Sequence, residues 1–156
     1  MKRNIFLLAL LMLVTLSFVA CDSNESTNNN DGPQHIVNTD IVGQWYLISW
    51  NNQTPEFEVY LDIKEEGTFD IYQQTWSLYY EHFTGLCYLN DNIITGKYSD
   101  GKDWSCGYQF DVSKGKLTLI SQQTPSVVSV YDSCLIPQEI IDEATTTRAE
   151  EIVPFL

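Results

Sequence analysis

Basic residues are scarce in this chain of 156 residues, which has 8 lysines and arginines against 21 aspartates and glutamates. Lys2 and Arg3 lie in a leader that we expect to be removed, and the remaining chain then has 6 basic residues and a net charge of −15. A surface this acidic repels phosphate backbones and anionic headgroups. The charge balance therefore argues against nucleic acid as a partner.

Histidine is scarcer still, and the chain has only His35 and His82. These two residues cannot supply a His-rich metal site, and a Cys–His dyad would have to use His82. Most acids fall at turns or at outward positions of expected strands, so no pair of carboxylates is singled out for glycoside hydrolysis. No phosphate-binding glycine loop follows a strand. We therefore expect no catalytic residues, no cofactor and no metal.

Long apolar runs are missing except for one, at residues 5–20. Lys2 and Arg3 precede this run, and a charged segment followed by an apolar one is typical of a secretory signal. The run is short for a membrane-spanning helix, which needs about 20 apolar residues. We therefore expect residues 1–20 to be a signal peptide, and no bilayer-spanning segment after it.

The boundary of this leader carries a second signal. The small residue Ala20 precedes Cys21, with Leu16 and Val19 upstream, and this arrangement resembles the lipobox of bacterial lipoproteins, although Phe18 stands where a smaller aliphatic is usual. The resemblance implies that Cys21 is lipidated and that the protein contacts the membrane through this lipid anchor. Several acyl chains on one residue are enough for stable anchoring.

The residues after Cys21 predict a tether but do not decide which membrane holds the protein. Residues 21–40 are rich in Asn, Ser, Thr and Asp and predict a flexible polar linker. Asp22 resembles an inner-membrane retention signal of enteric bacteria, whereas acidic tails at this place resemble surface-export signals of Bacteroidetes lipoproteins. We expect a lipid-anchored protein of the bacterial cell envelope, at the outer membrane and on its periplasmic or surface face.

The cysteines beyond the leader are an odd set, Cys87, Cys106 and Cys134. In an oxidising compartment we expect one disulfide among them and one free thiol. If an expected strand at 92–98 separates Cys87 from Cys106, two strand spacings of about 9.5 Å are too wide for a bridge. Either residues 84–90 form a loop that folds back, or the bridge involves Cys134. The spacings lack a CxxC, which argues against zinc.

The pattern from residue 41 onward predicts β-structure almost throughout. Residues 57–64 (FEVYLDIK) alternate apolar and polar side chains, the period of a strand with one buried face. A Glu-Glu-Gly turn follows, and residues 68–72 continue the alternation, which predicts a hairpin. Further strands are expected at 45–50, 76–83, 92–98, 106–112, 116–121 and 127–133.

These elements predict one domain, residues 41–156, and an all-β fold. Short turns join about eight strands, which favours an antiparallel up-and-down barrel because closure removes unpaired edges. Residues 136–148 depart from the pattern: Pro137 suits a first helical turn, and Ile140, Ile141 and Ala144 form a short apolar stripe. We expect a short C-terminal helix packed on the barrel.

The Gly-x-Trp at Gly43 and Trp45 opens the first expected barrel strand and resembles the lipocalins and other calycins, in particular lipocalin-like lipoproteins of Bacteroidetes. The resemblance implies that Trp45 plugs the barrel floor and that Gly43 lets the chain pass closely beneath it. Two features of lipocalins are missing: a Thr-Asp-Tyr turn, and an arginine directly after the last strand, because Arg148 comes later. A related barrel that closes its floor in its own way is therefore expected.

Two functions are open on this pattern. The resemblance implies a non-catalytic barrel that binds a small apolar or amphiphilic ligand, in a modest pocket away from Trp45. Inward residues expected to contact the ligand are Leu47, Val59, Leu61, Phe69, Ile71, Tyr108, Phe110 and Leu119. The alternative is a surface interaction module with a filled barrel, whose aromatic rim, with Trp50, Trp76 and Trp104 as candidates, binds glycan or protein. The oligomeric state is not indicated.

Overall fold

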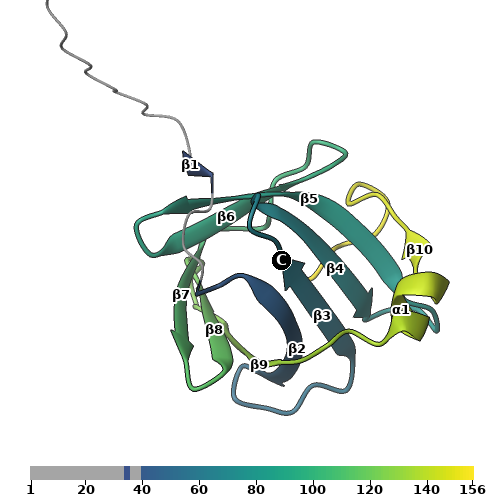
Figure 1. Cartoon of the computed structure of the whole chain (residues 1–156), viewed down its shortest axis with the longest axis horizontal. Coiled ribbons are helices and arrows are strands. Elements are labelled where there is room, and N and C mark those ends of the chain that lie inside the picture. Colours follow the sequence, from purple (N-terminus) through teal and green to yellow (C-terminus); the bar gives the residue numbers. More distant parts are fainter. Residues whose placement is uncertain (1–33, 36–39) are drawn as a thin grey trace, which may run out of the picture.

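The structure, a computed structural model, describes residues 34–35 and 40–156. Predictions for the leader and for the lipidated Cys21 lie outside the described residues. The described chain forms a closed antiparallel β-barrel of eight strands, β2 to β9, with one short helix near the C-terminus (Figure 1). The fold class expected from the sequence is confirmed.

The barrel is a simple meander. Each strand pairs with the next one in sequence, and β9 returns to pair with β2, which closes the ring. Closure leaves no unpaired edge between the first and last strands. The strands are β2 (Gly43–Trp50), β3 (Glu58–Ile63), β4 (Thr68–Gln74), β5 (Glu81–Asn90), β6 (Ile93–Tyr98), β7 (Tyr108–Ser113), β8 (Lys116–Ser121) and β9 (Val128–Ser133).

Strand β5 differs most from the sequence prediction. A strand was expected at 76–83, but residues 76–80 form a loop and the strand runs from Glu81 to Asn90. Its first part pairs with β4 and its second part with β6. Gly85 lies where the two partners overlap, and a Cβ there would lie 2.1 Å from the main-chain oxygen of Lys97. Glycine is therefore required where the strand bends to close the barrel.

The expected disulfide is not formed, because Cys87, Cys106 and Cys134 are all free thiols. Residues 84–90 belong to β5, so the loop that would have brought Cys87 near Cys106 does not exist. Cys87 is buried in the core, and its Sγ donates to the main-chain oxygen of Gly67 at 3.2 Å. The prediction of one bridge among these three residues is therefore wrong.

Side chains fill the barrel. Alternating residues of every strand point inward and pack into one cluster, as the sequence pattern predicts. Of the expected ligand contacts, Leu47, Val59, Leu61, Phe69, Ile71, Tyr108 and Leu119 are buried in this cluster, and Phe110 is half-buried against it. These residues pack against one another, so the middle of the barrel is a core.

Trp45 is 4% exposed and packs in the core where β2 begins, and we call this end of the barrel the closed end. Its Nε1 donates to the main-chain oxygen of Ile41 at 3.0 Å, which satisfies the buried indole nitrogen. Gly43 has a φ of 143°, which side chains rarely adopt. A Cβ there would lie 3.9 Å from the indole, an ordinary contact. The backbone conformation, rather than the close passage expected from the sequence, is what calls for glycine.

Two short elements flank the outside of the barrel. Helix α1 (Gln138–Glu143) follows Pro137, and Ile136 and Ile140 pack with Tyr72 of β4 in a second, smaller apolar cluster. After it, β10 (Thr145–Thr146) pairs in parallel with the start of β5. β1 (Gln34–His35), within the segment expected to be linker, pairs with Tyr88 and Leu89 near the other end of β5.

Candidate functional site

The candidate site is the end of the barrel opposite Trp45, which we call the open end. β2 starts near Trp45 and finishes at Trp50, so Trp50 marks the open end. Because the strands are antiparallel, the open end also contains the starts of β3, β5, β7 and β9 and the ends of β4, β6 and β8. Inward residues at these positions could meet a ligand.

Residues 149–156, which we call the plug segment, lie across the open end. In Figure 1 the C mark falls inside the outline of the barrel, and contacts with strand residues agree with this placement. Ala149, Pro154 and Leu156 are buried, and Ile152 and Phe155 pack partly against the barrel core. The plug segment was not anticipated from the sequence, which suggested only a helix in this region.

Gln73 holds the main chain of the plug segment. Its Oε1 accepts from the main-chain nitrogen of Phe155 at 2.8 Å, and its Nε2 donates to the main-chain oxygen of Val153 at 3.2 Å. The side chain is fully buried, and its Nε2 also lies 3.1 Å from Glu81 Oε2 and 3.0 Å from Thr75 Oγ1. These neighbours fix the orientation of the amide toward the segment.

Two further side chains bind the plug segment through its main-chain oxygens. Tyr98 Oη donates to the oxygen of Leu156 at 2.7 Å, and Lys102 Nζ donates to that of Ala149 at 2.7 Å. Burial raises the pKa of the Tyr98 hydroxyl, so it stays protonated and able to donate. Asp100 accepts from the main-chain nitrogen of Glu150 at 3.1 Å.

Three aromatic rings, one of them from the plug segment, pack together at the open end. Phe155 packs against both Trp50 and Phe57, with ring centroids at 6.3 Å and 5.7 Å, and Trp50 meets Phe57 edge-on at 5.5 Å. Tilted and edge-to-face pairs at these separations are favourable. The aromatic rim expected from the sequence is therefore present at Trp50, where it contacts the chain's own residues.

A hollow of about 150 Å³ remains beside Phe155. Aromatic faces and hydroxyl groups share its wall, because Trp50, Tyr108 and Phe155 line it together with Ser105, Ser121 and Ser129. Tyr108 Oη lies 2.9 Å from Ser105 Oγ, and burial raises the pKa of this tyrosine. The hollow therefore offers apolar surface and neutral hydrogen-bonding groups, a combination suited to a small amphiphile. Tyr108 is the expected ligand contact that lines it.

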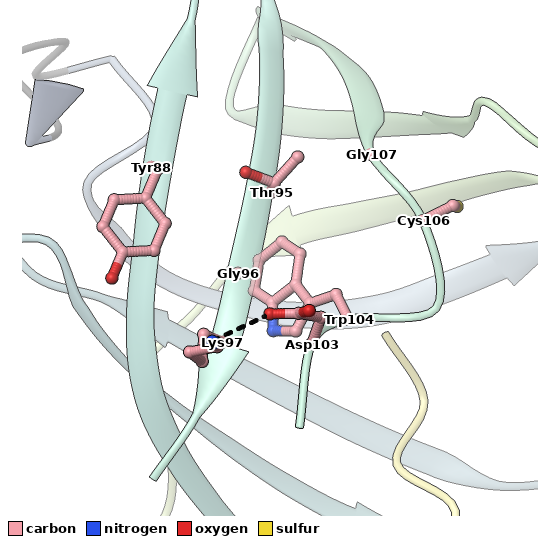
Figure 2. A pocket seen from close by; sticks show the side chains of 8 residues that line it. All are labelled: Tyr88, Thr95, Gly96, Lys97, Asp103, Trp104, Cys106 and Gly107. Atoms are coloured by element: carbon pink, nitrogen blue, oxygen red, sulfur yellow. Dashed lines mark ion pairs between the residues drawn. The ribbon is translucent and has the colours of Figure 1, made fainter. Parts of the chain in front are cut away.

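A larger hollow of about 500 Å³ lies outside the barrel, at the seam between β6 and β7 (Figure 2). These strands pair at only two positions, and Trp104 fills the gap between them. Its indole presses on Gly96, where a Cβ would lie 2.2 Å from the ring. Lys97 and Asp103 form an exposed ion pair at 3.5 Å across the rim. Trp104 is thus a buried wall residue, 5% exposed, and this candidate for the aromatic rim does not belong to an exposed rim.

A polar cluster lies on the outer face of β4 and β5. Asp70 accepts from Lys64 Nζ at 2.6 Å and lies 2.7 Å from His82 Nε2, while the His82 ring stacks on Tyr72. Burial tends to raise the pKa of Asp70, but hydrogen bonds from His82 and Lys64 outweigh it and lower the pKa. The cluster is an ion-paired patch of the barrel wall.

Two of the three thiols in the described chain, Cys87 and Cys134, are not activated. Burial raises the pKa of Cys87 to about 12, and burial with the nearby Asp62 raises the pKa of Cys134. Such thiols remain protonated at neutral pH and are poor nucleophiles. Among the described residues, no three His, Cys, Asp or Glu side chains gather where a metal could bind. The described part of the chain also has no helix long and apolar enough to cross a bilayer.

One exposed apolar loop stands out, at residues 75–80 between β4 and β5. Trp76, Leu78 and Tyr79 are 84%, 86% and 74% exposed. Gln74 Nε2 donates to the main-chain oxygen of Leu78 at 2.7 Å, and Ser77 Oγ donates to that of Tyr79 at 2.5 Å. These bonds hold the loop in a defined shape at the open end of the barrel.

Comparisons with known proteins give no family for this chain. No family model matches it, and no curated protein matches its sequence.

Proposed function

We propose that this protein is a lipid-anchored, lipocalin-like barrel of the bacterial cell envelope that binds a small apolar or amphiphilic ligand and catalyses no reaction. The observation that carries the proposal is the hollow of about 150 Å³ at the open end, with its aromatic and hydroxyl wall. Because the core fills the barrel below it, the ligand is no larger than a short acyl chain or a single ring.

The place where β1 joins the barrel supports a ligand site at the open end. β1 joins β5 at Tyr88 and Leu89, near the closed end that holds Trp45. A lipid on Cys21, the anchor expected from the leader, would thus connect to the barrel from its closed end. The tether then leaves the open end uncovered, so that a ligand from solution can reach it.

An apolar fluorescent dye tests the ligand site on the intact protein. We expect saturable uptake by the parent protein, and loss of uptake on Ser129→Leu, because a leucine at this buried position of β9 fills the hollow. The matched control is Ser133→Leu, which changes the same residue type on the same strand at the closed end. Equal dye uptake by both variants, or none by the parent, would show that the hollow binds no ligand.

A second candidate function comes from the loop at residues 75–80. Trp76 and Tyr79 expose aromatic faces in a loop whose shape is held by hydrogen bonds, and such faces stack on sugar rings or on protein side chains. The loop therefore supports an interaction module that binds glycan or protein.

A glycan array with Trp76→Ser and Leu135→Ser separates the two functions. Leu135 is 87% exposed but lies just after β9, at the closed end. Binding lost only in Trp76→Ser would favour the interaction module. Equal array signals from the parent and both variants would argue against a role for the loop.

A further inference from the structure

The plug segment meets the barrel as a bound peptide meets a receptor. Gln73 contacts its main chain at Val153 and again at Phe155, two residues further on, which is the spacing at which a neighbouring strand would bond. Pro154 lies between them and has no main-chain N–H, so no donor is left without a partner at this buried position. The side chain of Gln73 therefore recognises the main chain of an extended segment.

Side chains of the segment add selectivity. Pro154 and Leu156 are buried, Phe155 packs against Trp50 and Phe57, and Val153 is 69% exposed. The open end thus accepts a proline, an aromatic ring and an aliphatic side chain in order, and leaves the residue before the proline in solvent. This pattern defines the chemistry of an acceptable occupant.

Residues 153–156 are attached less firmly than the strands. In the described part of the chain, these residues make no hydrogen bond to the main chain of the barrel, and side-chain bonds from Gln73 and Tyr98 hold them with apolar contacts. Segments outside the strand ladders open at a lower free energy than the core. None of these residues is paired within the closed ring of β2 to β9, so their release breaks no strand pairing.

We propose that the open end is a binding groove for an extended apolar peptide of the type Pro-aromatic-aliphatic, and that residues 153–156 are its resident, exchangeable occupant. The groove consists of Gln73, Tyr98, Trp50 and Phe57. This peptide groove is a different site from the small-ligand hollow beside Phe155, and peptide binding is tested with a peptide instead of a dye. Either proposal can therefore fail without the other.

The test uses a variant that ends at Ile152, which keeps the contacts of Lys102 and Asp100 with the segment. A fluorescently labelled peptide with the sequence of residues 153–156 is titrated against it, and anisotropy reports binding. We expect saturable binding, at least about tenfold weaker to the full chain, because a tethered occupant competes at an effective concentration in the millimolar range.

Two point variants of the shortened protein separate the groove from a nonspecific surface. Gln73→Leu removes both hydrogen bonds to the peptide backbone and should weaken binding about tenfold or more. Gln109→Leu makes the same change at an exposed position of β7 and should bind like the parent. Equal peptide affinities of the two variants would overturn the proposal.

A second variant covers the case in which the shortened chain fails to fold. Phe155→Ser with Leu156→Ser in the full chain weakens the resident occupant and leaves every groove residue unchanged. We expect this protein to bind the labelled peptide more tightly than the parent does. Absence of peptide binding by a folded variant would overturn the proposal. Unfolding of both the shortened and the double variant would also overturn it, since the segment would then be a permanent part of the core.

Discussion

Replacement of Trp45 with alanine tests whether this residue closes the barrel. The indole is almost fully buried among core residues at the start of β2, and its Nε1 donates to the main-chain oxygen of Ile41. Alanine would remove the ring, leave a cavity at the closed end and leave the Ile41 oxygen without its donor. The substitution therefore acts on packing and on hydrogen bonding together.

The expected cost follows from these losses. Deletion of a buried tryptophan side chain destabilises a protein by about 3–5 kcal/mol, of which the lost hydrogen bond accounts for about 1 kcal/mol. Domains of this size have free energies of unfolding of about 5–15 kcal/mol. Trp45→Ala should thus remove a large share of the stability and make the barrel marginal at 37 °C.

Urea denaturation followed by circular dichroism measures this cost. With a slope of about 2 kcal/mol per molar urea, a loss of about 4 kcal/mol moves the midpoint down by about 2 M. The matched control is Trp76→Ala, which deletes the same side chain from the exposed loop and should leave the midpoint nearly unchanged. Similar midpoints for the two variants would refute the placement of Trp45 at a packed, closed end.

Three further predictions follow from the strands and the leader. Gly85→Ala should destabilise the barrel by about 1–3 kcal/mol, measured by urea denaturation, because its Cβ would collide with the Lys97 main chain; an unchanged midpoint would contradict the bend in β5. Asp70→Asn should lower stability at neutral pH. The pKa of Asp70 is held below its ordinary value of 3.8, so the carboxylate stabilises the fold above pH 3.8 and loses this effect as the pH falls through the lowered pKa. The difference in stability between the parent and the variant should therefore shrink in acid, and a difference independent of pH would contradict this. Cys21→Ser should abolish incorporation of labelled fatty acid and partitioning into detergent, and unchanged partitioning would exclude the lipid anchor.

The strands were largely predictable because their burial is periodic. Residues 57–64 alternate in sequence, and the strand formed there, β3 (Glu58–Ile63), alternates in burial as well. Residues 68–72 lie in β4, where the outward side chains Asp70 and Tyr72 are also covered, so only the sequence pattern alternates there. The segment 116–121 matches β8 at both ends. The prediction failed at 76–83, where several apolar residues in a row imitate a buried strand. There the polar Glu81 begins the strand, and Trp76 is in solvent.

The candidate site was predictable only in part. Tyr108 lines the hollow because its alternation places it inward near the open end. Gln73 was missed because a glutamine on a strand next to another glutamine gives no sign of facing a barrel interior. Its inward position follows from the same alternation as Phe69 and Ile71, and this signal could have found it.

What the sequence by itself determined is the barrel, because strand alternation and short turns depend on neighbouring residues. The buried position of Trp45 belongs to the same class, since it follows from the alternation along β2. The occupant of the open end was decided by tertiary structure alone. Residues 153–156 meet Gln73 about 80 positions away, and no local pattern encodes a contact across that distance. Their burial depends on the space that the strand ends leave, which exists only once the ring has closed.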